Sequence, residues 1–145
     1  MEDTTYPGLE EQGHLRSLIS RYARSLDAAD VSAVLRCLAE DISLSYDGGR
    51  LQFVGKAEAE RFFRNALREP STHLLSNYGF ERRGAEVVVS CSAIACVFRD
   101  PGAATMKGLV YSFTCTPGGG NSLIRRLEHR ATWEFSVPTS LRPPA

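Results

Sequence analysis

The chain after Pro70 consists of four long segments with the composition of β-strands, separated by short turns. The segments span 72–82, 85–99, 104–116 and 122–137. Connections such as Arg83-Gly84 and Asp100-Pro101-Gly102 have the length of hairpins, and hairpins join antiparallel neighbours. The second half of the chain therefore predicts a four-stranded antiparallel meander, against which the first half must pack.

The first 70 residues predict three helices and a short hairpin. Between Leu9 and Asp27, apolar residues recur at helical spacing and form one stripe: Leu15, Leu18, Ile19, Tyr22, Ala23 and Leu26. Shorter helices are expected over 31–39 and 57–67, with strands over 41–47 and 50–54 between them. The pattern predicts an α+β fold in which a cone-shaped, curved antiparallel sheet wraps over N-terminal helices. We expect a single domain over 1–145, with its core at about 9–137.

Composition narrows the class of protein. Of the 145 residues, 43% are apolar and 23% are charged, as in soluble globular domains. Lys plus Arg and Asp plus Glu number 17 each, so no net field favours nucleic acid or an acidic membrane surface. No apolar run approaches the roughly 20 residues of a membrane span, and the polar N-terminus lacks the apolar core of a signal peptide. We expect a cytoplasmic protein with no nucleic-acid and no membrane partner.

The four cysteines are Cys37, Cys91, Cys96 and Cys115. They form no CxxC pair, and no histidine lies near them at metal-ligand spacing. Cys91 and Cys96 are five residues apart on one expected strand, so their side chains point to opposite faces. We interpret all four as buried apolar thiols and expect neither a metal site nor a disulfide framework.

The segment Ser71–Phe80 is the main candidate for chemistry. Alternation along this expected strand places His73, Leu75 and Asn77 on one face, so a group that can transfer a proton lies among apolar neighbours. Taken alone, this pattern favours a hydrogen-bonded core histidine. Asp27 lies at the edge of the first helical stripe, where a carboxylate can reach the interior, although a solvated helix end is the simpler interpretation.

Other polar residues on expected strands need partners, because unpaired burial costs about 1–3 kcal/mol for each group. Ser112 and Thr114 share a face of the third long strand, and we expect such residues to pair with each other, with Asp27 or Tyr46, or with water in a cavity. The open end of a curved sheet would provide such a cavity for a small hydrophobic molecule. Both faces of the middle strands are apolar, which predicts a homodimer or homotrimer formed through the convex side of the sheet.

Four short stretches, by their order and spacing, carry a family resemblance over nearly the whole domain. They are Tyr22–Asp27 followed by Ala28-Ala29-Asp30; Leu44-Ser45-Tyr46 with Phe53-Val54-Gly55; Ser71–Asn77; and Thr105–Gly108 with Ser112 and Trp133-Glu134-Phe135. With these stretches the chain resembles the SnoaL-like and scytalone-dehydratase-like branch of the NTF2-like (cystatin-like α+β) superfamily.

Scytalone dehydratase removes water from a small cyclic hydroxyketone without a metal or cofactor. The resemblance implies that His73 is a base, that Asp27 orients it, and that Tyr46 holds a water on the substrate carbonyl. It also implies that Ser112 is a pocket serine. The chain departs from that enzyme at three positions, where Leu26, Val97 and Thr114 replace a tyrosine, a histidine and an asparagine. These departures predict a different substrate, with the proton-transferring half of the site retained.

The candidate site residues follow from these arguments. The catalytic candidates are His73, Asp27 and Tyr46. The substrate-binding candidates are Tyr22, Asn77, Ser112, Thr114, Phe53 and Trp133. His129 is expected to be structural or part of the pocket wall.

Three functions remain open. The leading hypothesis is a cofactor-independent lyase, isomerase or cyclase that acts on a small apolar, cyclic or polyketide-derived metabolite by His-Asp general acid/base catalysis in a buried pocket. The second is a cyclase in which Asp27 or Glu134 is a lone acid. The third is a ligand carrier or a structural subunit resembling the small subunit of ring-hydroxylating dioxygenases. In that case Phe53, Phe63, Tyr78 or Trp133 would fill the pocket, and His73 would bond to the backbone.

Overall fold

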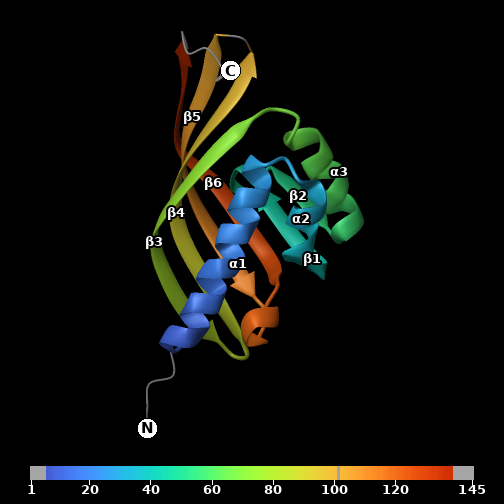
Figure 1. The fold of residues 1–145 in the computed structure, drawn as a ribbon, viewed down its shortest axis with the longest axis vertical. Helices are drawn as coiled ribbons and strands as arrows, with labels where there is room; N and C mark the ends of the chain where they lie inside the picture. The colour runs from blue at the N-terminus through green and yellow to red at the C-terminus, as the bar shows by residue number, and fades with distance from the viewer. Residues whose placement is uncertain (1–5, 101, 139–145) are drawn as a thin grey trace.

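Three helices cover one face of a curved six-stranded sheet (Figure 1), which confirms the α+β class. The computed structural model describes residues 6–100 and 102–138, so both ends of the expected domain lie outside the described residues. The helices are α1 (Leu9–Asp27), α2 (Val31–Arg36) and α3 (Lys56–Ala66). The strands are β1 (Leu38–Tyr46), β2 (Leu51–Val54), β3 (Ser71–Arg83), β4 (Glu86–Asp100), β5 (Ala103–Cys115) and β6 (Ile124–Pro138). Short 3-10 turns are η1 (Asp47–Gly49) and η2 (Gly119–Asn121).

The strands are ordered β2-β1-β6-β5-β4-β3. Strands β3 to β6 form the antiparallel meander that the hairpin turns predicted. Strand β1, however, runs parallel to β6, so the expectation of a wholly antiparallel sheet is wrong. Short turns determine which consecutive strands pair, but they do not determine which strand adds to the free edge of a meander.

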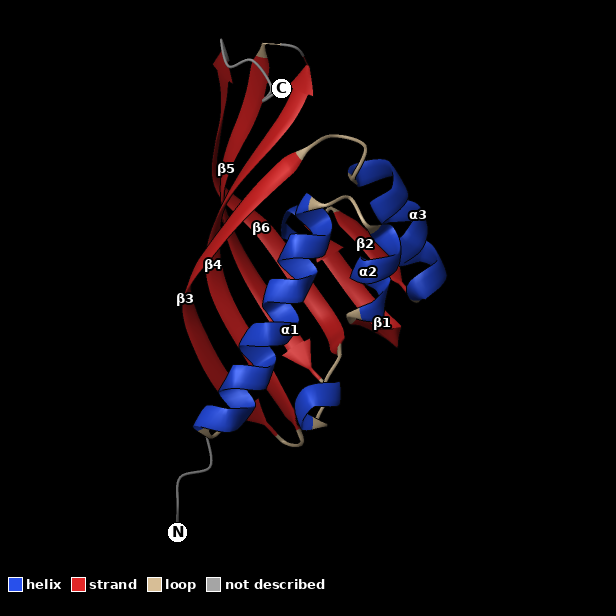
Figure 2. Ribbon diagram, in the orientation of Figure 1, coloured by secondary structure: helices blue, strands red, loops and turns tan. Residues whose placement is uncertain are grey.

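We call the sheet face under the helices the inner face and the opposite one the outer face (Figure 2). The predicted stripe of α1 is buried against the inner face, where Val89, Phe113 and Leu127 are fully enclosed. The second helix is shorter than expected, because Leu38 already pairs with Ile124 in the sheet. Asp30 caps that helix by accepting the Ala33 N–H at 3.0 Å. Among the described residues, no helix is both long and apolar enough to cross a bilayer.

Among the register shifts of the sheet, one in β3 and one in β6 change which of the predicted site residues face inward. In β3 the pairing shifts between Ser76 and Gly79, and Asn77 adopts a left-handed backbone with φ 55°. The side chains of Tyr78 and Phe80 therefore lie on the inner face, where the Arg16 guanidinium stacks over both rings.

The second bulge lies in β6. Leu109 pairs with Ala131 but Gly108 pairs with Trp133, which leaves Thr132 without an opposite residue. Beyond this point Trp133 lies on the outer face and Glu134 on the inner face, the reverse of what strict alternation predicts.

Candidate functional site

A histidine and an aspartate meet on the inner face, where the end of α1 lies beside the start of β3. Asp27 Oδ1 is 2.6 Å from His73 Nδ1, and the His73 backbone N–H donates to Asp27 Oδ2 at 3.0 Å. The Ser71 hydroxyl lies 3.4 Å from Oδ1 as a further donor. The structure therefore brings together the two residues that the helix edge and the strand face singled out, and it holds the carboxylate from both of its oxygens.

This contact decides the tautomer of His73. A carboxylate can only accept hydrogen bonds, so the neutral imidazole carries its proton on Nδ1 and leaves the Nε2 lone pair free. The His73 side chain is 11% exposed and Asp27 is 29% exposed, so both are largely withdrawn from bulk water. The pair has the geometry of a base whose ring orientation is fixed by an acid.

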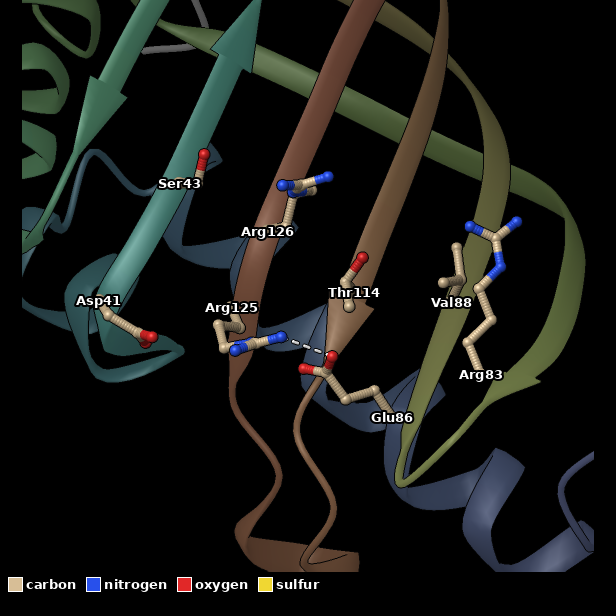
Figure 3. A pocket seen from close by; sticks show the side chains of 8 residues that line it. All are labelled: Asp41, Ser43, Arg83, Glu86, Val88, Thr114, Arg125 and Arg126. Atoms are coloured by element: carbon tan, nitrogen blue, oxygen red, sulfur yellow. Dashed lines mark hydrogen bonds and ion pairs between the residues drawn. The ribbon is translucent and has the colours of Figure 1, made fainter.

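His73 lines a cavity of about 180 Å³ on the inner face. Its apolar wall includes Leu26, Phe63 and Val97. Leu26 and Val97 are two of the positions at which the sequence departs from the polar residues of scytalone dehydratase. A larger depression of about 370 Å³ lies on the outer face (Figure 3). The charged groups that line it are mutually paired or solvated, as in the Arg125–Glu86 contact at 2.6 Å. The smaller cavity is the better candidate because buried titratable groups converge there.

Two tyrosines supply hydroxyl groups on one side of this cavity. The hydroxyls of Tyr22 and Tyr46 are 2.6 Å apart, and Tyr46 lines the cavity directly. Burial raises the pKa of both phenols, and in Tyr22 the neighbouring Tyr46 raises the pKa further. Both side chains are therefore neutral hydrogen-bond donors at physiological pH. The ring of Tyr22 packs edge-on against Phe63 and Phe113, which holds the hydroxyl pair in place.

His129 forms a neighbouring part of the wall. Its ring stacks on Tyr46 with 4.6 Å between centroids, and the Asp47 backbone N–H donates to its Nδ1 at 3.4 Å. Burial, and then the charge of Lys107, lower the pKa of His129 to about 4. The imidazole is neutral at pH 7, in agreement with an Nδ1 that accepts a hydrogen bond.

Lys107 was not among the residues predicted for the site. It lies on the inner face of β5, where it pairs with Ala95 and Glu134 on the neighbouring strands. It lines the cavity, and its side chain is 23% exposed. Its ammonium nitrogen is 3.9 Å from Glu134 Oε2. A signal was present in the sequence, since alternation placed this lysine on the apolar face of Leu109 and Tyr111.

The other predicted binding residues lie outside the cavity. Asn77 is exposed at the β3 bulge, because the extra residue turns its side chain away. Ser112 and Thr114 lie on the outer face of β5, opposite to Tyr111 and Phe113. Their expected placement in the pocket is therefore wrong.

Phe53 and Trp133 are also displaced from the expected position. Phe53 packs on Phe62 at 4.8 Å and borders a separate groove, and the β6 bulge carries Trp133 to the outer face. Tyr78 packs under Arg16 instead. Of the four aromatic residues that would fill the pocket of a non-catalytic protein, Phe63 alone lines it, and the His73 ring bonds to Asp27 rather than to backbone.

The cysteines and carboxylates offer no second kind of centre. All four cysteines are free; Cys96 is only half-buried, contrary to expectation, and burial raises the pKa of Cys91 to about 12. Within 6–100 and 102–138, no group of three or more His, Cys, Asp or Glu side chains is placed to hold a metal ion.

Comparisons with known proteins agree with this architecture. A putative aromatic ring hydroxylase from Novosphingobium aromaticivorans is 22% identical, with 92% of this chain and 96% of that chain covered at a TM-score of 0.81. A putative scytalone dehydratase from the same organism is 18% identical, with 92% and 91% covered and a TM-score of 0.77. A hexachlorocyclohexane dehydrochlorinase is 14% identical, with 94% and 95% covered and a TM-score of 0.81. At these identities the likeness concerns the fold.

No curated protein sequence matches the chain. The family model described as SnoaL-like domain matches residues 7–128, which is most of the chain. Together with the curved sheet and its helix-covered inner face, this match shows that the protein belongs to the SnoaL-like domain family.

Proposed function

We propose that this protein is a cofactor-independent lyase, isomerase or cyclase that acts on a small apolar, cyclic or polyketide-derived metabolite by His-Asp general acid/base catalysis. The observation that carries the proposal is the 2.6 Å contact between Asp27 Oδ1 and His73 Nδ1 at the edge of the apolar cavity. An oriented imidazole with its Nε2 lone pair available in a largely apolar pocket is suited to removing a proton from carbon or oxygen.

The residues have separate roles in this mechanism. His73 Nε2 takes the proton, and the Asp27 carboxylate stabilises the imidazolium that forms. In an elimination, the electron pair of the broken C–H bond becomes the new double bond while a group on the adjacent carbon leaves with its bonding electrons. In an isomerisation, the proton returns from Nε2 to a different carbon. The Tyr46 hydroxyl, supported by Tyr22, donates to a substrate oxygen in either reaction.

The comparisons give modest support for this choice. Two of the similar structures are described as a putative scytalone dehydratase and a hexachlorocyclohexane dehydrochlorinase, and both names denote eliminations. The family match and the shared fold are compatible with such chemistry.

The test is a proton-exchange assay that needs no knowledge of the leaving group. Hydroxyketones and polyketide intermediates are incubated with the protein in D₂O, and loss of individual C–H signals is followed by proton NMR. We expect His73→Gln to slow exchange or turnover by roughly 10²–10⁴-fold, with Asp27→Asn slowing it by a similar factor. The matched control is His14→Gln, on the outside of α1.

The two variants also separate the rival mechanisms. Full turnover by His73→Gln would show that His73 is not the base. A loss confined to Asp27→Asn would favour the cyclase with a lone acid, because a coupled pair should suffer from either change.

A further inference from the structure

We infer that Lys107 forms a cationic subsite for a substrate oxygen that carries or develops negative charge, so that the substrates are enolisable carbonyl compounds. The inference rests on the proposed function for its catalytic meaning, although the binding site itself can be tested without turnover.

The subsite follows from one row of side chains across the inner face. His73 pairs with Ala95, Ala95 pairs with Lys107, and Lys107 pairs with Glu134, on the successive strands β3 to β6. Neighbouring strands lie about 4.8 Å apart, so the backbones of His73 and Lys107 are separated by roughly 10 Å. Only the methyl group of Ala95 lies between them, and it forms a small, buried floor. The row therefore places a base and a cation at opposite ends of one short gap.

The surroundings of Lys107 favour an anionic partner in that gap. Lys107 shares the inner face of β5 and the cavity lining with Leu109 and Tyr111, and its side chain is only 23% exposed. The ion pair with Glu134 spans 3.9 Å, which is longer than a direct hydrogen bond, and the Glu134 side chain is half exposed. A cation held in an apolar wall by one long, solvated contact retains donors for a ligand oxygen.

The geometry fits the formation of an enolate. His73 Nε2 removes the proton from the carbon next to a carbonyl group, and the electron pair of that bond moves onto the carbonyl oxygen. The Lys107 ammonium stabilises the resulting oxyanion and gives up no proton. The oxyanion then collapses: either the proton returns to another carbon, or a β-hydroxyl leaves and takes the proton from His73 as water. In both cases the imidazole and the ammonium are regenerated.

The probe is 4-nitrophenol, whose ionised oxygen resembles an enolate and whose absorbance reports ionisation. Its affinity for the whole chain is measured by absorbance titration between pH 5 and 9 and compared with that of 4-nitroanisole, which cannot ionise. We expect Lys107→Met to weaken binding of the phenolate about tenfold, because the substitution removes one charge-assisted hydrogen bond to the ligand. Binding of 4-nitroanisole should change by less than about twofold, because an unbranched apolar side chain replaces the lysine stem.

Two further variants keep the result interpretable. Lys107→Arg retains the charge and should retain most of the preference for the phenolate. Lys56→Met is the matched control, because the other lysine of the chain pairs with Glu40 at 3.3 Å outside the cavity. Circular dichroism and thermal melting establish that each variant is folded.

Equal phenolate binding by the native chain and Lys107→Met would overturn the inference, and so would an equal loss in Lys56→Met. These failures differ from a failure of the proposed function. His73→Gln should slow proton exchange but keep the preference for the phenolate, whereas loss of the subsite should remove the preference in the presence or absence of His73.

Discussion

The half-buried imidazole of His129 makes the stability of the protein dependent on pH. Its ring is enclosed by Tyr46 and Tyr111, and three charged or titratable groups act on it: Lys107 from β5 and His73 from β3 lower its pKa, while Asp47 from η1 opposes them. The pKa falls from the ordinary 6.5 to about 4 in the folded chain. Protonation would also convert Nδ1 from acceptor to donor and so break the contact with the Asp47 N–H.

The sign and size of the effect follow from proton linkage. At pH 5 the unfolded chain binds a proton at this histidine and the folded chain does not, so stability falls as the pH is lowered. With pKa values of 6.5 and about 4, roughly 2 kcal/mol of unfolding free energy should be lost between pH 7.5 and 5. The loss should approach about 3 kcal/mol below pH 4, where carboxylates also titrate.

The assay is urea unfolding of the native chain and of His129→Gln at pH 7.5 and 5. Glutamine keeps a polar side chain that can accept the Asp47 N–H but does not titrate, so this variant should lose much less stability on acidification. His14→Gln, which changes a half-exposed histidine, should behave like the native chain. Equal pH dependence in the native chain and His129→Gln would refute the reasoning, as would an NMR titration that places the midpoint of His129 near 6.5.

Further predictions concern the two faces of the sheet. On the outer face, four residues are direct neighbours on four successive strands: Leu74, Ile94, Gly108 and Trp133. The side chains of Leu74 (65%), Ile94 (45%) and Trp133 (42%) are exposed. We expect this row to bind a second copy of the chain, because large apolar side chains in one exposed row mark interfaces. Leu74→Glu should then lower the mass measured by light scattering towards that of a monomer. An unchanged mass would contradict the interface. A Cβ at Gly108 would lie 2.1 Å from the Trp133 indole nitrogen, so Gly108→Ala should displace the single tryptophan and shift its fluorescence to longer wavelength; an unchanged spectrum would argue against the packing. On the inner face, Ala95→Leu should fill the floor between His73 and Lys107, costing about 1–3 kcal/mol of stability and abolishing binding of 4-nitroanisole; calorimetry that finds binding unchanged would place the ligand elsewhere.

Much of the fold was predictable because its signals are local. The stripe of α1 and the short turns between the long segments specify a helix and a meander without knowledge of tertiary contacts. The pairing of Asp27 with His73 was accessible only through the family resemblance, because the local patterns alone favoured a core histidine and a solvated helix end.

The misplacements of Asn77 and Trp133 arose where one extra residue changes the face that later side chains of a strand occupy. For Ser112 and Thr114 the alternation was right, but the wrong face of β5 was taken as the pocket side. Asn77 and Thr132 are each compatible with a regular strand, so the sequence gives no local sign that they are extra. Alternation therefore placed Trp133 in the cavity and left Glu134, the partner of Lys107, on the wrong face. The parallel pairing of β1 with β6 was equally inaccessible, because it joins segments distant in the chain.

The bulge at Thr132 also affects how this chain should be aligned with its relatives. Thr132 donates its hydroxyl to the Gly108 carbonyl at 3.2 Å, and beyond it the pairing of β6 with β5 continues with the register shifted by one residue. A homologue that lacks the residue equivalent to Thr132 would present every later side chain of the strand on the same face of the sheet as this chain does. An alignment without a gap at Thr132 would equate Trp133 with inward-pointing positions of such homologues and Glu134 with outward-pointing ones. Evolutionary conservation at the end of β6 should therefore be evaluated only after a single-residue gap has been introduced at Thr132.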